Sequence, residues 1–222
     1  MTAYDICEIE SLRDVYGPYP VDSAAVRIVM PRLHPHHRAF IALSPFLVIA
    51  STDAQGFPDV SPKGDFPGFV QMPDDETLII PDRPGNKKLL TLSNIVENPN
   101  VSLIFFIPGR TDTVRVNGKA RITTDPVVLE QFGIKGKLPE TALVITVELA
   151  WLHCAKALIR SQLWEPEARV DVGALPSVGK MTRDQIADFD AVAYDARQQD
   201  WESAGQDREA ETTLWGVEKS PH

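Results

Sequence analysis

Short apolar runs separated by turn-forming residues recur through the middle of this chain, and they constrain its fold most. Such runs, bounded by Gly, Pro, Asn and Asp, predict β-strands, and Asp53-Ala-Gln-Gly56 between two of them predicts a hairpin turn. Five to seven strands joined by short turns favour a mainly β fold, an antiparallel barrel with peripheral helices, over alternating βαβ units. Eight ranges are candidates for these five to seven strands: 46–50, 57–63, 66–71, 77–80, 101–107, 113–122, 142–149 and 153–164.

Helical patterns flank these runs. The tail pattern begins at Thr182, which with Gln185 fits a capping box, and predicts a helix to Ser203 that packs on its own barrel or docks on a second copy. Three regions follow: a helical segment at 1–44, a barrel domain at 45–165, and a loop with a helical tail at 166–222. The other predicted helices are 9–16, 22–29 (beginning at Asp22 or Ser23), 38–44, 87–92 and 125–132.

The net charge and the composition limit which classes of binding partner and which cellular compartment we expect for this protein. The net charge of −9 argues against a broad electrostatic grip on nucleic acid or anionic lipid, because such binding needs many Lys and Arg side chains at phosphates. Two cysteines, Cys7 and Cys154, form no disulfide framework, and no apolar stretch is long enough to span a membrane. We therefore expect a cytoplasmic protein without nucleic-acid or membrane partners.

Cationic and small polar residues gather at the ends of two apolar runs. The first group lies in 59–65, and the second follows the short run 78–80, where Pro81 and Pro84-Gly85 force a turn. Backbone N–H groups of that turn, two lysines and the start of a helix suit a phosphate group. The sequence thus predicts a phosphorylated cofactor, held by Asp59, Val60, Ser61, Lys63, Pro81, Asp82, Arg83, Asn86, Lys87 and Lys88.

Other reactive residue types do not form a recognisable centre. His34, His36 and His37 have no carboxylate or cysteine at a ligand spacing, so they predict a loop entering a helix and no metal site. Cys154 lies beside His153 and Lys156, but a small cysteine in an apolar run is more often a packing residue than a nucleophile. No separate catalytic residue is predicted.

Four motifs in order resemble the pyridoxamine 5′-phosphate oxidase-like, FMN-binding split-barrel superfamily, and within it a bacterial subgroup of FMN-dependent enzymes. The resemblance covers about residues 40–165 and implies a dimeric antiparallel split barrel. The Arg-His pair that pyridoxamine phosphate oxidases carry near the C-terminus has no counterpart here, so the vitamin B6 substrate is not implied. The motifs are Ser61-Pro-Lys63, the turn at 81–88, the run Val114-Arg-Val-Asn-Gly118 and the segment 153–164.

The resemblance implies a role for each matching residue. Lys63 matches a strand-end lysine at the flavin, and Asn86-Lys87-Lys88 matches the turn that clasps the FMN phosphate. Thr113 matches the polar residue that opens the third motif, and Arg115 follows two places on. Late in the barrel, the residues that complete the pocket from a partner subunit are matched by Arg160, Ser161 and Trp164.

The function that follows from the resemblance is an FMN-dependent oxidoreductase. It is expected to be a homodimer that acts on a small molecule, with NADH or NADPH as a possible electron donor, while flavin N5 supplies the redox centre. The alternative is a flavin carrier or sensor without catalysis. A weaker alternative places haem or a deazaflavin in the same barrel.

Overall fold

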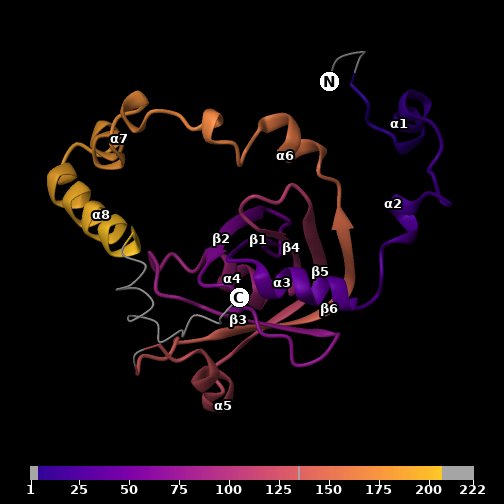
Figure 1. The fold of residues 1–222 in the computed structure, drawn as a ribbon, viewed down its shortest axis with the longest axis horizontal. Helices are drawn as coiled ribbons and strands as arrows, with labels where there is room; N and C mark the ends of the chain where they lie inside the picture. Colours follow the sequence, from indigo (N-terminus) through magenta and orange to yellow (C-terminus); the bar gives the residue numbers. More distant parts are fainter. Residues whose placement is uncertain (1–4, 135, 207–222) are drawn as a thin grey trace. The chain divides into compact units, whose positions relative to one another are not determined.

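The computed structural model describes residues 5–134 and 136–206 (Figure 1). These residues divide into two compact units. The first comprises the described residues up to Ile80 together with Lys88–Ile122 and Leu143–Ala155. The second comprises Pro81–Lys87, Thr123–Ala142 and the described residues from Lys156 onward.

Six strands form one antiparallel sheet with the order β2-β1-β4-β5-β6-β3, in agreement with the expected split barrel. The turn at 53–56 joins β1 to β2 as predicted. There Asp53 Oδ1 accepts hydrogen bonds from the N–H groups of Gln55 (2.9 Å) and Phe57 (2.8 Å), and Gly56 has a φ of 85°. The strands are β1 (Phe46–Thr52), β2 (Pro58–Gly64), β3 (Thr77–Pro81), β4 (Asn100–Phe106), β5 (Thr113–Thr123) and β6 (Ala142–His153).

The described helices lie mostly where the sequence predicts them, with boundaries that differ. Helix α3 begins before residue 38, because Pro35 suits the first helical turn and His34 caps it. The α-helices are α1 (Ile9–Tyr16), α2 (Ala24–Arg27), α3 (Pro35–Leu43), α4 (Leu90–Glu97), α5 (Pro126–Leu129), α6 (Lys156–Ser161), α7 (Val178–Gln185) and α8 (Ala191–Gln206). Short 3-10 turns are η1 (Glu130–Phe132), η2 (Pro166–Ala168) and η3 (Val172–Ala174).

Strand alternation gives the sheet of the first unit two distinct faces. The inner face carries the core residues Leu47, Ile49, Leu103, Phe105, Val114 and Val116, and Phe40 and Ile41 of α3 belong to the same buried cluster. The register aligns Val48 with both Pro62 and Ile104, and Ile104 with Arg115. The outer face consists of Val48, Ala50, Val60, Pro62, Ser102, Ile104, Phe106, Arg115, Asn117, Lys119 and Arg121.

Two predicted strands are wrong. Residues 66–71 form only one isolated bridge, Gln71 with Ile79, although Phe69 and Val70 are buried in the core. Residues after His153 leave the sheet and form α6, so the segment 153–164 is not a strand. Short apolar runs fit a strand and a helix equally well, and only packing separates the two.

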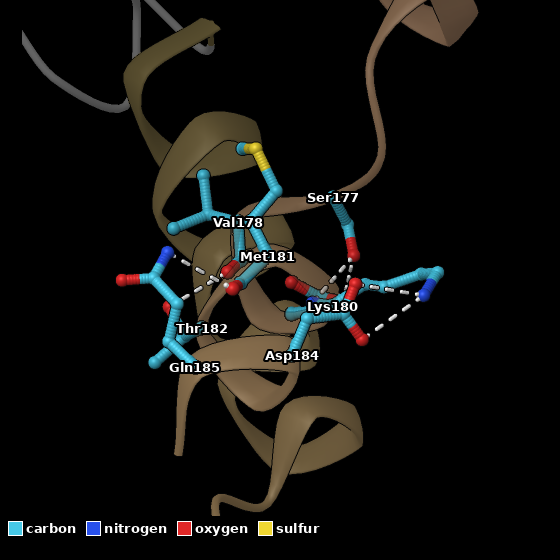
Figure 2. Close-up of polar contacts among 8 residues, drawn as sticks. Ser177, Val178, Lys180, Met181, Thr182, Asp184 and Gln185 are labelled. Carbon is cyan, nitrogen blue, oxygen red and sulfur yellow. Dashed lines mark hydrogen bonds and ion pairs between the residues drawn. The ribbon is translucent and has the colours of Figure 1, made fainter.

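The tail helix is interrupted, and its predicted capping box does not form. Ser177 begins α7 by accepting a hydrogen bond from the Lys180 N–H at 3.1 Å, so Thr182 lies inside the helix, where its hydroxyl donates to the Val178 carbonyl at 2.8 Å (Figure 2). From α8, Asp195 accepts hydrogen bonds from the Ser177 hydroxyl (2.6 Å) and the Gly179 N–H (2.8 Å). Two helices, α7 and α8, separated by residues 186–190, therefore replace the continuous helix 182–203.

Candidate functional site

Strand β2 presents a row of polar residues on the inner face of the sheet. Asp59, Ser61 and Lys63 are half-buried and lie opposite Ser51, Ile49 and Leu47 of β1. The Asp59 carboxylate accepts a hydrogen bond from the Thr91 hydroxyl at 3.0 Å, which joins the edge strand to the first turn of α4. Helix α4 thus begins beside this row.

Helix α4 starts three residues later than predicted, because Lys87 (φ 58°) and Leu89 (φ 57°) both adopt left-handed backbone conformations. Lys88 therefore immediately precedes the cap residue instead of lying in the first helical turn, and both lysines are exposed. Lys88 lies between them without a positive φ, so the two kinds of conformation alternate through this turn. Alternation of this kind can direct neighbouring backbone N–H groups toward one side, which is a common way to bind an anion. The local backbone suits a phosphate without a helical first turn.

Strand β5 carries the next two predicted site residues. Thr113 is 1% exposed, and its hydroxyl has no hydrogen-bond partner among the described residues. Arg115 lies on the outer face with its guanidinium 5.1 Å from the ring centroid of Trp151. Lys63 is on the inner face, so within one chain Lys63 and Arg115 lie on opposite faces of the sheet.

The remaining predicted residues belong to the second unit. Asp82 donates its N–H to the Thr141 carbonyl at 2.9 Å, and the Arg83 guanidinium donates to the Phe132 carbonyl at 2.8 Å. Arg83 thereby fixes the turn after Pro81 to the 3-10 turn η1. Asn86 and Lys87 are exposed at the end of this segment.

The segment that was expected to complete the pocket is helical. Arg160 and Ser161 are exposed in α6, where the Ser161 hydroxyl donates to the Leu158 carbonyl at 3.1 Å. Trp164 is half-buried beyond the helix. This segment therefore presents its polar residues from a helix and a turn.

Sequence reasoning missed two partners of the predicted residues. Thr91, the partner of Asp59, falls at the end of the predicted helix 87–92, and a threonine at that position does not by itself indicate a contact with a distant strand. Trp151 lies beyond the predicted end of its strand at Leu149, although the apolar run that continues through this residue was a usable signal.

The three neighbouring histidines form a helix cap. His34 Nδ1 accepts a hydrogen bond from the His36 N–H, and His37 Nδ1 accepts one from the His34 N–H, each at 3.2 Å. Burial of His37, together with the nearby His34 and His36, lowers the pKa of His37 below its ordinary value of 6.5. Within the described ranges, no group of three or more His, Cys, Asp or Glu residues has an arrangement that could hold a metal ion.

Stability is therefore expected to fall in mild acid. The folded chain favours neutral His37, whereas the unfolded chain takes up a proton near pH 6.5, so the free energy of unfolding decreases as pH falls below that value. The loss is at most about 1.4 kcal/mol per pH unit for one such group. His37→Asn keeps an acceptor for the His34 N–H but cannot titrate, and should flatten the profile.

Urea unfolding at several pH values between 5 and 8 measures this difference. His36→Asn is the matched control, because His36 is exposed and uses only its backbone N–H in the cap. Parallel profiles for the wild type and His37→Asn would show that His37 does not cause the acid loss.

A comparison with models of protein families identifies the family of this chain. The model for pyridoxamine 5′-phosphate oxidase matches residues 33–154, which is more than half of the chain and runs from the segment before α3 through all six strands. This chain belongs to the pyridoxamine 5′-phosphate oxidase family. Ser61, Lys63, Asn86, Lys87, Lys88, Thr113 and Arg115 all lie inside the match, whereas Arg160, Ser161 and Trp164 follow it.

Several solved structures of family-like proteins are similar to this chain. HupZ from Group A Streptococcus is 22% identical, with 54% of this chain and 93% of that chain covered and a TM-score of 0.44. A putative pyridoxamine 5′-phosphate oxidase from Lactobacillus delbrueckii is 22% identical, with 55% of this chain and 95% of that chain covered and a TM-score of 0.43. The heme storage protein HutZ from Vibrio cholerae is also 22% identical, with 53% of this chain and 91% of that chain covered and a TM-score of 0.38. No curated protein matches the sequence.

No described helix is long and apolar enough to cross a membrane.

Proposed function

We propose that this protein binds FMN and acts as an FMN-dependent oxidoreductase on a small molecule, with NADH or NADPH as electron donor. The observation that carries the proposal is the family match over residues 33–154, which contains the lysine-rich turn, the polar row of β2 and Thr113. When bound, FMN supplies the redox chemistry, and the protein supplies binding and orientation.

The residues present fit a phosphorylated flavin. The buried Thr113 hydroxyl has no hydrogen-bond partner among the described residues, so a ligand polar group at that point would satisfy it. Lys87, Lys88 and Asn86 supply two cations and an amide donor on a local backbone that favours anions. The same short turn therefore offers both charge and directed hydrogen bonds to a phosphate.

Each group has a distinct task in this proposal. Lys87 and Lys88 neutralise the phosphate charge, while Lys63 places a positive charge beside the ring and Ser61 offers it a hydroxyl. Asp59 is held by Thr91, which keeps its carboxylate directed at α4. Arg160, Ser161 and Trp164 complete the pocket from a second copy.

A homodimer is part of the proposal. Lys63 and Arg115 lie on opposite faces of one sheet. A single flavin therefore contacts Lys63 of one copy and Arg115 of the other where the two copies meet. Each dimer would then hold two cofactor sites with contributions from both chains.

An absorbance spectrum of the purified protein, after incubation with FMN and desalting, tests the proposal. We expect flavin bands to remain with the protein and to bleach on anaerobic addition of NADH or NADPH. Bound flavin that neither donor reduces would support the carrier or sensor instead. Absence of flavin, with haem or a deazaflavin retained in parallel incubations, would overturn the FMN assignment.

A further inference from the structure

The N-terminal arm, residues 5–22, leaves its apolar side chains uncovered. Ile9, Leu12 and Tyr16 share one face of α1 by their spacing, and their exposures are 72%, 40% and 78%. No residue of α1 is buried. The arm thus presents an amphipathic helix without a surface to cover its apolar face.

A helix of this kind needs such a surface. Isolated helices shorter than about 12–15 residues are only marginally stable in water, because nucleation costs more than a few hydrogen bonds return. Helix α1 has eight residues, and its Arg13 guanidinium lies 5.2 Å from the Tyr19 ring centroid, a contact within the arm itself. Docking of the apolar face would supply the missing stabilisation.

The outer face of the sheet is a matching surface in the same unit. It exposes apolar side chains at one edge, where Phe46 at the start of β1 is 38% exposed and Val60 on the edge strand β2 is 62% exposed. It also contains a hollow of about 350 Å³ lined in part by Ala50, Ser102 and Asn117. An apolar sheet face in contact with water is unusual unless another element covers it. The outer face is therefore a candidate docking surface for the apolar face of a helix.

Charge complementarity selects the arm as the occupant. Residues 5–22 carry five acidic side chains and one arginine. Beyond Arg115, which the proposed flavin site uses, strand β5 places Lys119 and Arg121 on the outer face, and Glu148, which pairs with Lys119 at 3.5 Å, is the acidic residue beside them. In a chain with a net charge of −9, a basic row beside an apolar surface is a local exception.

We propose that the acidic arm of one copy docks on the outer face of a second copy, and that the two copies exchange their arms reciprocally. No described residue of the same chain buries either surface, whereas the exchange covers two arms and two outer faces in one two-fold assembly. The inference rests on the proposed homodimer and specifies how its two copies recognise each other.

Charge reversal on each side tests the exchange. The arm variant Glu10→Lys/Asp14→Lys and the face variant Lys119→Glu/Arg121→Glu change exposed residues only. We expect each variant alone to raise the dimer dissociation constant at least tenfold, measured by sedimentation velocity on the full chain. Thermal unfolding of each variant checks that the fold is retained.

Mixing the two variants separates exchange from self-docking. In a mixed dimer, α1 of the arm variant, which then carries three basic and no acidic side chains, meets the acidic face of the other chain. The unchanged acidic arm meets the unchanged basic face, so both contacts are restored. We expect the mixture to dimerise with a dissociation constant within about threefold of the wild type. If each arm docked on its own chain instead, mixing the two variants would restore neither contact.

Leu12→Asp gives a second test that does not depend on charge pairing, and it should also weaken the dimer because it places a carboxylate on the docking face of α1. A monomeric wild type, variants as dimeric as the wild type, or a mixture that stays dissociated would each overturn the exchange. Flavin content, read from absorbance on the same samples, is scored separately: loss of flavin with unchanged dimerisation counts against the cofactor proposal alone.

Discussion

Replacing Lys87 and Lys88 together by alanine is expected to weaken FMN binding by at least about 100-fold. Each charge-assisted hydrogen bond to the phosphate contributes roughly 1.5–3 kcal/mol, and each 1.4 kcal/mol is tenfold in affinity. Both side chains are exposed, so the substitution removes charge without disturbing the core. Fluorescence titration with FMN measures the change.

The matched control is Lys137→Ala/Lys180→Ala, which removes the same charge from exposed positions elsewhere. The partner of Lys180 is Asp184 at 3.1 Å in an exposed pair, and such pairs contribute little to stability. FMN affinity should not change in this control. Equal weakening in both double variants would indicate a general charge effect, and full retention of flavin in Lys87→Ala/Lys88→Ala would contradict the phosphate assignment.

Gly118→Ala is expected to destabilise the sheet by about 3 kcal/mol or more, since overpacking that moves backbone is costly. A Cβ atom at Gly118 would lie 2.1 Å from the Thr146 carbonyl oxygen and 3.2 Å from the Ile145 side chain. The strands β5 and β6 pass so closely here that only a glycine fits. For a chain of this size the melting temperature should fall by about 6–12 °C, measured by circular dichroism.

Gly173→Ala is the control for this prediction. The nearest atom to its added Cβ would be Asp171 Oδ1 at 3.5 Å, which is an ordinary contact. Its melting temperature should remain close to that of the wild type. A normal melting temperature for Gly118→Ala would mean that β5 and β6 separate more easily than their close approach implies.

The sequence predicted the sheet well where the signal is local. Alternation in β5 and the turn chemistry of Asp53 and Gly56 both act over a few residues, and the structure confirms them. The family resemblance, which rested on four short motifs, is confirmed by the match over residues 33–154. The roles of the individual site residues stay predictions.

Helix boundaries were predicted less well, for identifiable reasons. The left-handed conformations of Lys87 and Leu89 delay α4 until Leu90, and nothing in the residue types announces them. At the tail, Thr182 with Gln185 has the capping pattern, but Asp195 on α8 binds both Ser177 and Gly179 and so settles the start of α7. A residue sixteen or more positions away lies outside any local window.

The sequence by itself determined that this chain builds an antiparallel sheet and carries a lysine-rich turn, because periodicity and turn residues act between neighbours in the chain. Only the tertiary structure decided that Lys63 and Arg115 lie on opposite faces, that the Thr113 hydroxyl is buried without a partner among the described residues, and that α1 has no buried side chain. Those facts depend on strand register and burial, which distant segments impose on one another.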